Sequence, residues 1–435
     1  MDKLQGIVKG FNTVQYNGKL INCWINKVDD HRVRQPLDLF QYMDEVIEIE
    51  GKLKNDLWEA KFIKKFNKAN EAKSLNDLLR IRATNIRDLN EKVKDNNGTA
   101  LGYKWTNKRN TKHPCIMIFV QKKKICELVP KSQRAPKILI GPNGVWCLTD
   151  VISWKERKVS ALKLSNKNKD VVKKLHSGKT GLIGGIKLAY KKKKGNSVEV
   201  KDCGTAGIVV ERKDGKKGFL TNKHVAGKPG REIYHHGCSG DAIGYTSSLP
   251  LPFEDINFKD WYNINSNEKN TKVTCDYAFV EFYKKTKKNE NSINHGLFEI
   301  GNIGSVMEID LQKMDIIGQK VISIGSKSGI QRGTIVAYSY RWHHEPETKI
   351  GDKTLEEYNI YTDLLIRGEQ GEHFSSKGDS GKVIVSDDDE HLPIGLLWGG
   401  TVKDILIDKK KKQYNWSYAI NLGKILNHSK LSIYK

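Results

Sequence analysis

The second half of this chain constrains its fold most, because short apolar segments alternate there with turn residues. From about residue 182 to the end, segments such as GFLT, DYAFVEF, GKVIV and PIGLLWGG have strand length and are separated by stretches with many turn residues. No solenoid or propeller repeat interrupts this pattern. It predicts a mainly β fold, with a pair of antiparallel β-barrels over residues 181–435.

The first 180 residues have a different pattern. Residues 1–68 alternate like strands, with EVIEIEGKL and LWEAKFIKKF around a short turn, which is typical of a small OB-like β module. Residues 70–95 have helical periodicity, and residues 98–152 combine CIMIFV and GVWCLTDVI as strands of a small α/β unit. The polar stretch 155–180 predicts a linker or a surface helix. We therefore expect three parts, which are residues 1–68, 70–180 and 181–435.

The basic charge of the chain is concentrated in one region. The formal net charge is +24, and residues 71–200 contain 30 Lys and Arg against 10 Asp and Glu, with runs at Lys122–Lys124 and Lys191–Lys194. Such a field can attract nucleic acid or an acidic protein partner, although a solvated basic face is the more ordinary explanation. The nearly neutral N-terminal module argues against a strong phosphate-binding groove.

The cysteines and the N-terminal segment favour the cytoplasm. The seven cysteines form no CxxC pair, so free thiols are expected rather than disulfides. They are Cys23, Cys115, Cys126, Cys147, Cys203, Cys238 and Cys275. The start MDKLQGIVKG lacks the pattern of a signal peptide, and no apolar run reaches the roughly 18 residues of a membrane span. We expect no membrane association.

One serine lies in a sequence suited to nucleophilic catalysis. In KGDSG, glycines at 378 and 381 flank Ser380 and allow a tight turn, before GKVIV continues as a strand. A serine hydroxyl needs a neighbouring base to take its proton and two N–H groups aimed at the developing oxyanion. Ser380 is therefore a candidate nucleophile.

Two further residues complete the chemistry. His224 follows the apolar strand GFLT, so a rigid strand end would hold it at a cleft as a general base. Asp276 opens the strand segment DYAFVEF, where its carboxylate could fix the tautomer of His224. The chain order His224, Asp276, Ser380 is the order of chymotrypsin and differs from that of subtilisin and of the α/β-hydrolases.

Residues 203–435 resemble trypsin-like serine peptidases, on the motifs LTNKHVA, DYAFV and GDSG. From about residue 75 onward the chain is similar to the plant Narrow Leaf type and its bacterial relatives. The matching segments are GPNGVWCLTDV, GTAGIVV, GFLTNKHVA, IGSKSGIQRGTIVAY, KGDSGKVIV, PIGLLWGGT and NWSYAINLG. The resemblance implies a double antiparallel β-barrel of chymotrypsin type, preceded by the small α/β unit and the OB-like module.

The resemblance also assigns roles to residues. It implies that Ser380 is the nucleophile, that His224 is the general base, and that Asp276 orients His224. The N–H groups of Gly378 and Ser380 would form the oxyanion hole. Substrate-binding residues would be Leu397, Trp398 and Gly399, which would pair with an extended substrate, and Phe374, which stands six positions before the nucleophile. No cofactor or metal is implied.

The sequence departs from the trypsin pattern at several positions. Lys382 replaces the usual second glycine, and we expect its side chain to point to solvent. Phe374 replaces the acid that selects Arg or Lys, so an apolar residue before the scissile bond is expected. Secreted relatives pair the Asp before the nucleophile with a new N-terminus. In this chain, we expect Asp379 to find an internal donor instead.

The chain also contains two weaker motifs, and three functions are compatible with its sequence. His235-His236-Gly237-Cys238 has no second ligand pair for zinc, and Gly325–Gly329 (GSKSG) is expected to be a turn because it lacks the P-loop spacing.

The leading hypothesis is an intracellular serine endopeptidase acting on a protein or peptide substrate. The alternatives are a catalytically silent double-barrel scaffold and a nucleic-acid-binding protein that uses residues 71–200. A homo-oligomer also stays open.

Overall fold

The computed structural model divides into two compact units, residues 1–96 with 101–153 and residues 97–100 with 154–435. Before residue 67 it describes backbone strands alone. The described residues are 13–16, 19–24, 39–42, 45–54, 57–93, 95–106, 109–121, 123–124, 128–153, 164–177, 180–194, 197–235, 242–248, 256–257, 261–262, 272–273, 275–283, 293–342, 361–369, 373–400, 405–407, 410–412 and 416–434.

The N-terminal module is a five-stranded antiparallel sheet in which each strand pairs with the next in sequence. Its strands are β1 (Thr13–Tyr16), β2 (Lys19–Trp24), β3 (Leu39–Tyr42), β4 (Glu45–Lys54) and β5 (Leu57–Asn67). The strand-like alternation in this region is thus confirmed as β structure. The OB-like assignment stays a prediction, because the described pairings join consecutive strands alone.

The predicted helix is α1 (Leu75–Lys92), which packs with strands of the α/β unit in the first unit. It begins with a capping box in which Ser74 and Asp77 each accept from the other's backbone N–H. The apolar residues on its inner face are all buried, namely Leu78, Leu79, Ile81, Ile86 and Leu89. The accompanying strands are β6 (Asn96–Thr106), β7 (Arg109–Val120), β8 (Ile138–Ile140) and β9 (Trp146–Ser153), with β7 and β9 parallel.

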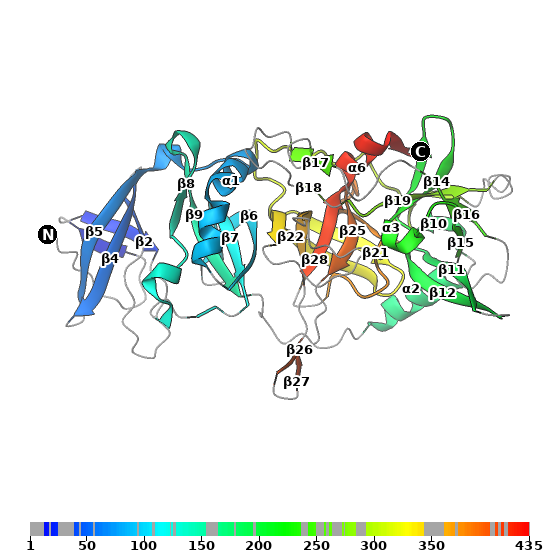
Figure 1. Ribbon diagram of the computed structural model, residues 1–435, viewed down its shortest axis with the longest axis horizontal. Helices are drawn as coiled ribbons and strands as arrows, with labels where there is room; N and C mark the ends of the chain where they lie inside the picture. The colour runs from blue at the N-terminus through cyan, green and yellow to red at the C-terminus, as the bar shows by residue number, and fades with distance from the viewer. Residues whose placement is uncertain are drawn as a thin grey trace. The chain divides into compact units, whose positions relative to one another are not determined.

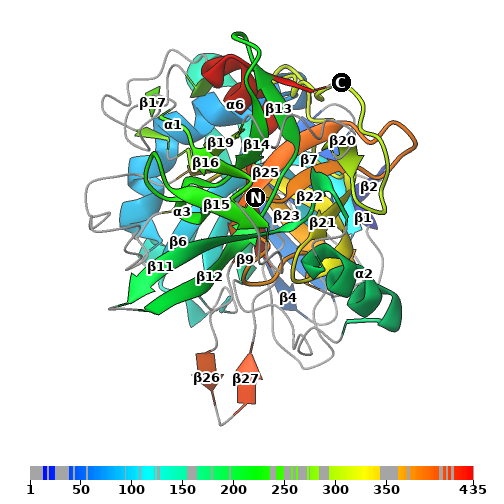
Figure 2. The ribbon, with the colours of Figure 1, turned by 90° about the vertical axis from the view of Figure 1, so that its right-hand side faces the viewer.

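An eight-stranded antiparallel sheet forms the first half of the second unit, and its strands face the viewer in Figure 2. In spatial order they are β12 (Ser197–Thr205), β11 (Lys187–Lys194), β15 (Glu232–His235), β16 (Gly244–Thr246), β19 (Ala278–Phe282), β14 (Lys217–Thr221), β13 (Val209–Arg212) and β29 (Leu431–Ile433). Its core includes Phe219 and Phe282, whose rings meet edge to face with centroids 5.0 Å apart.

Six antiparallel strands close into a barrel in the second half of this unit, because β21 pairs with both β24 and β22. Around the barrel they are β21 (Lys320–Gly325), β24 (Val383–Ser386), β25 (Pro393–Gly400), β28 (Trp416–Asn421), β23 (Tyr361–Gly368) and β22 (Gly329–Trp342). Strand β24 is buried on both faces, which agrees with its continuous apolar run VIV. The predicted mainly β architecture is confirmed.

The two longer helices among the described residues of the second unit are those before residue 180 and near the C-terminus. The polar stretch before residue 180 contains α2 (Asn166–His176), and Asn168 of this helix bonds both the N–H and the carbonyl of Ile330 in β22. The C-terminal helix α6 (Leu422–Ser429) follows β28 and packs near β25 (Figure 1), with Asn421 as its N-cap.

The remaining elements are short. They are the 3₁₀ turns η1 (Lys68–Asn70), η3 (Lys131–Gln133) and η4 (Pro142–Gly144), the helical turn α3 (Lys223–Ala226), the parallel pair β10 (Leu182–Gly184) with β20 (Ile293–Leu297), and the hairpins β17 (Ile256–Asn257) with β18 (Lys272–Val273) and β26 (Ile405–Ile407) with β27 (Lys410–Lys412).

Candidate active site

His224 lies on a single helical turn directly after strand β14. The strand GFLT is buried and ends at Thr221, and the helical turn α3 begins after Asn222, which has an extended backbone. Gly227 stops the turn with a φ of 78°, a value at which glycine is favoured. The strand end therefore presents His224 from a rigid support, as the sequence predicts.

Asp276 holds this histidine by two hydrogen bonds. The His224 backbone N–H donates to Asp276 Oδ1 at 3.1 Å, and the ring Nδ1 bonds Asp276 Oδ2. The carboxylate is buried, with 2% of its side chain exposed, whereas the histidine side chain is 38% exposed. The acid is thus shielded and the base remains partly accessible to solvent.

The environment of His224 changes its pKa. Burial lowers the pKa of the imidazole, but the charge of Asp276 and its hydrogen bond raise it more, so the net pKa is above the ordinary value of 6.5. A histidine with a raised pKa stays protonated to a higher pH. Its use as a general base would therefore require a pH further above 6.5 than an unperturbed histidine needs.

Ser380 lies in a turn that two glycines make possible. Gly378 and Gly381 have φ values of 102° and 96°, where a side chain is strained. The carbonyl of Ser380 accepts from the N–H of Thr205 at 2.9 Å, and the N–H of Gly381 donates to the carbonyl of Leu397 at 2.9 Å. The turn is therefore fixed from both sides, by a strand of the first sheet and a strand of the closed barrel.

The N–H groups around the nucleophile divide into two kinds. Those of Asp379, Gly381 and Lys382 donate to backbone carbonyls at 3.0, 2.9 and 3.1 Å. Those of Gly378 and Ser380 have no acceptor among the described residues. Two unused donors on either side of Asp379 are what a developing oxyanion would need.

The elements that carry His224 and Ser380 meet at Gly204. A side-chain carbon at Gly204 would lie 2.5 Å from Cγ2 of Val225, the neighbour of His224, and 2.7 Å from the Ser380 carbonyl oxygen. Glycine is therefore required where these two segments converge. Between the His224 ring and the Ser380 hydroxyl, both of them described, there is no hydrogen bond.

The predicted substrate strand is β25. Leu397 is buried, and its N–H donates to the carbonyl of Lys382 at 2.9 Å. Trp398 is half-buried, and its Nε1 donates to Thr362 Oγ1 at 3.1 Å. Gly399 is also half-buried, and the pairing with β28 shifts register between Leu397 and Gly399. Leu397 thus lies in the core, and Trp398 and Gly399 are half-buried after it.

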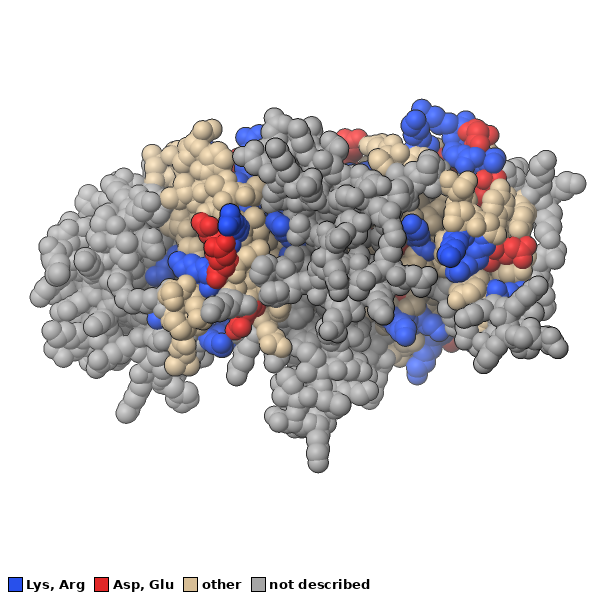
Figure 3. Space-filling view, in the orientation of Figure 1, with Lys and Arg blue, Asp and Glu red and all other residues tan. Residues whose placement is uncertain are grey.

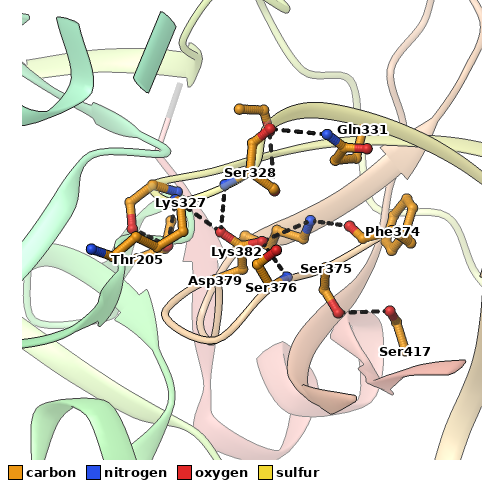
Figure 4. Close-up of polar contacts among 12 residues, drawn as sticks. Thr205, Lys327, Ser328, Gln331, Phe374, Ser375, Ser376, Asp379, Lys382 and Ser417 are labelled. Atoms are coloured by element: carbon orange, nitrogen blue, oxygen red, sulfur yellow. Dashed lines mark hydrogen bonds and ion pairs between the residues drawn. The ribbon is translucent and has the colours of Figure 1, made fainter. Parts of the chain in front are cut away.

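The expectation that Lys382 points to solvent is wrong. Its side chain is fully buried, and Nζ donates to the carbonyl of Phe374 at 2.6 Å (Figure 4). The Phe374 ring is also fully buried and lies beneath the ammonium at 4.6 Å. In the interior, the Asp379 carboxylate and the Phe374 carbonyl are the partners that water would otherwise supply to this ammonium. The role of Phe374 in substrate selection stays a prediction.

Asp379 finds its donors inside the fold, as expected. Its carboxylate accepts from the N–H groups of Lys327 at 3.0 Å and Ser328 at 3.2 Å, and from Ser376 at 2.8 Å. The two former donors belong to the segment GSKSG, which is confirmed as the turn between β21 and β22. Sequence reasoning missed this use of the turn, because backbone donors have no residue-type signal.

Other predictions fall partly outside the described residues. Cys115, Cys147 and Cys275 are free thiols, and the side chains of the other cysteines are not among the described ones. In the HHGC motif, His235 Nε2 bonds the carbonyl of Leu175, and His236–Cys238 lie outside the described residues. No metal-binding cluster is found among the residues that are described, and none of their helices is long and apolar enough to span a membrane.

The basic surface of residues 71–200 is only partly described. Lys122 and the side chains of Lys192–Lys194 lie outside the described set. On the face shown in Figure 3, the described Lys and Arg side chains occur in several groups with Asp and Glu near them. Binding of nucleic acid or an acidic partner stays a prediction.

A closed six-stranded antiparallel barrel with a second antiparallel sheet, joined by the Ser380 turn, defines the chymotrypsin-like protease fold. The crystal structure of Nocardiopsis protease is similar over 58% of this chain and 99% of that chain, with a TM-score of 0.35 and 16% identity.

Sequence comparison identifies the family. The "Nal1 C-terminal domain" matches residues 177–435, and the "NARROW LEAF 1 N-terminal domain" matches residues 70–152. The chain belongs to the Nal1 family, which confirms the resemblance seen in its motifs. It is 30% identical to Protein NARROW LEAF 1 of Oryza sativa subsp. japonica over 381 residues, covering 84% of this chain and 61% of the rice protein.

A bacterial relative carries a protease name. The chain is 28% identical over 242 residues to "Probable serine protease Ga0098714_109514" of Bradyrhizobium tropiciagri, covering 50% of this chain and 28% of that protein. The chain therefore spans less than two thirds of the length of both curated relatives.

Proposed function

We propose that this chain is a serine endopeptidase that hydrolyses peptide bonds of a protein substrate through an acyl-enzyme. The observation that carries the proposal is the pair of unused N–H groups at Gly378 and Ser380, on the turn that presents the Ser380 hydroxyl. The His224–Asp276 pair supports it, because a partly exposed imidazole is held by a buried carboxylate.

The proposed reaction uses the side chains of Ser380, His224 and Asp276 together with two backbone N–H groups. Ser380 Oγ attacks the carbonyl carbon of the scissile bond and gives its proton to His224 Nε2. The negative charge that develops on the carbonyl oxygen is stabilised by the Gly378 and Ser380 N–H groups. His224 then donates the proton to the leaving amine, and a water molecule activated by His224 hydrolyses the acyl-enzyme. Asp276 stabilises the imidazolium in both steps.

The substrate in this proposal is an extended polypeptide that adds a strand beside Leu397, Trp398 and Gly399. The pocket would accept an apolar residue before the scissile bond, since Phe374 stands where an acid would select Arg or Lys. We place the reaction in the cytoplasm, and the free thiols of Cys115, Cys147 and Cys275 support a reducing compartment.

The test compares the wild type with Ser380→Ala in two assays. Labelling by a fluorophosphonate probe and cleavage of a peptide library should both be lost in Ser380→Ala, while circular dichroism remains that of the wild type. Ser432→Ala is the matched control, because Ser432 is an exposed serine in β29. Labelling that survives in Ser380→Ala would remove this residue from its role.

A catalytically silent double barrel is the second candidate. The observation in its favour is that the His224 ring and the Ser380 hydroxyl, among the described residues, share no hydrogen bond. Such bonds are often long before substrate binds, so the geometry does not decide between the two. A wild type that neither labels nor cleaves any library peptide would favour the scaffold.

A further inference from the structure

Lys382 is a buried lysine two residues after the proposed nucleophile. Its side chain and that of Asp379 are each 0% exposed, and Lys382 Nζ lies 3.8 Å from Asp379 Oδ2. The same Nζ donates to the Phe374 carbonyl at 2.6 Å. An ammonium group is unfavourable in a protein interior unless it is paired and hydrogen-bonded, so these contacts account for its burial.

Asp379 depends on this ammonium for charge balance. Its carboxylate accepts three backbone N–H groups, from Lys327, Ser328 and Ser376, and none of these donors carries a net charge. Lys382 is a cation paired with this carboxylate, at 3.8 Å. Figure 4 shows the carboxylate between the Lys327–Ser328 turn and the Lys382 side chain.

These contacts join the two ends of the nucleophile loop, which comprises residues 374–382. Lys382, at one end, is bonded to the carbonyl of Phe374, at the other end, across eight positions. Asp379, in the middle, is fixed to a turn of the closed barrel. The N–H groups of Gly378 and Ser380 flank Asp379, so their directions follow from how its carboxylate is held.

We propose that Lys382 is a positioning residue, which acts through Asp379 and the Phe374 carbonyl to hold the Gly378 and Ser380 N–H groups toward a developing oxyanion. The inference rests on the proposed peptidase function. It also means that the loop needs no newly cleaved N-terminus, because the cation that neutralises Asp379 is already inside the fold.

The inference predicts an alkaline limit of activity. Burial lowers the pKa of Lys382 to about 8, and the charge of Asp379 opposes this change. The other groups near the ammonium are the Phe374 ring and carbonyl, while Lys327 contributes its backbone N–H to Asp379. The neighbouring His373 is also buried. Above pH 8 the neutral amine no longer balances Asp379, so activity should fall.

The experiment follows fluorophosphonate labelling rates from about pH 6 to about pH 10. Lys382→Met should label about 100-fold more slowly at neutral pH, as expected when oxyanion donors lose their alignment. Lys382→Arg keeps the charge, and its alkaline limit should move to a higher pH. Lys377→Met is the matched control, because Lys377 is exposed in the same loop and should label like the wild type.

Several outcomes would overturn the inference. One such outcome needs the wild type alone, namely a labelling rate that is the same from pH 7 to about pH 10. Lys382→Met that labels at the wild-type rate with the same alkaline limit would also overturn it. A merely structural lysine would lower the melting temperature but leave the pH profile of the labelling rate unchanged.

A second measurement separates this inference from the proposed function. Hydrogen exchange of residues 374–382 is compared between Ser380→Ala and Ser380→Ala with Lys382→Met, with residues 209–221 as the internal reference. Faster exchange confined to 374–382 supports the positioning role even if the wild type proves inactive. Equal exchange in the two proteins overturns it even if the wild type hydrolyses peptides.

Discussion

The side-chain amide of Asn222 donates to the backbone carbonyl of Asp276 at 2.6 Å. The helical turn that carries the proposed base is thereby joined to the strand start that carries its acid by a third contact, in addition to the two bonds made by His224. Both Asn222 and Asp276 are buried, so water does not compete for this bond. The separation of base and acid is therefore fixed by a residue outside the proposed triad.

Asn222→Ala should lower both stability and activity. The lost hydrogen bond leaves the Asp276 carbonyl unsatisfied in the interior, at a cost of about 1–3 kcal/mol in the free energy of unfolding. Chemical denaturation and probe labelling measure the two effects. Asn427→Ala, at an exposed position of α6, serves as the control. An unchanged labelling rate in Asn222→Ala would mean that His224 and Asp276 align without it.

The acid limit of wild-type activity should lie above pH 6.5. His224 must be neutral to accept a proton, and the charge of Asp276 raises its pKa, so more alkaline solution is needed to deprotonate it. The measurement is the pH dependence of kcat/KM on a library-derived peptide. A midpoint at or below the pKa of about 6.5 of a free histidine would contradict the observed pairing.

Asp276→Asn should remove most of the activity and move the acid limit. The loss of the carboxylate favours the wrong imidazole tautomer, so kcat should fall about 10⁴-fold. The pKa of His224 should also return toward or below its ordinary value. Burial lowers this pKa, and in Asp276→Asn the carboxylate charge no longer opposes the effect of burial. NMR titration of the His224 ring in Asp276→Asn checks the direction without requiring activity.

Gly381→Ala should destabilise the second unit strongly. A Cβ there would lie 2.2 Å from Thr221 Oγ1 and 2.3 Å from the Thr205 carbonyl oxygen, at a φ of 96°. Strain and overpacking together should cost about 3–5 kcal/mol. Gly215→Ala is the matched control, because its φ is 76° and nothing lies within 4 Å of the added carbon. Equal melting temperatures of the two variants would contradict the close approach.

Asp363→Ala should loosen the C-terminal helix. The buried carboxylate accepts from Trp261 Nε1, from the Tyr262 hydroxyl and from the backbone N–H of Asn421 at 3.0, 2.7 and 2.8 Å. Removing it deprives three buried donors of the hydrogen bonds that they make to this carboxylate, at a cost of about 3 kcal/mol or more. The urea midpoint measures the effect. An exposed substitution, Asp389→Ala, should leave that midpoint unchanged.

The β architecture and the proposed triad are readable in the sequence for a physical reason. Strand alternation and turn residues are local, and the chain order of His224, Asp276 and Ser380 survives whatever the loops between them do. The helix α1 was predictable in the same way, because its apolar face repeats with helical period. Local sequence patterns thus predict the individual segments, and the order of the motifs predicts the chymotrypsin-like fold.

The burial of Lys382 was not readable, because it depends on how residues 374–382 fold back on themselves and on a turn far away in the chain. Its closest acceptor is a carbonyl eight positions earlier, and the carboxylate near it is fixed by a turn 52 positions before Asp379. A lysine is usually exposed, and this one is buried since the fold supplies an acceptor and an anion. One signal was present: Lys382 opens the run VIV, which is buried on both faces.

Thr205 connects the two halves of the second unit by hydrogen bonds. Its N–H bonds the Ser380 carbonyl, its hydroxyl bonds the Gly378 carbonyl at 3.0 Å, and its own carbonyl accepts from Thr221. A rotation of the first sheet against the closed barrel would therefore pull directly on the turn that carries Ser380. Any force or binding event that displaces the β11–β12 hairpin would also displace this turn, because Thr205 belongs to β12.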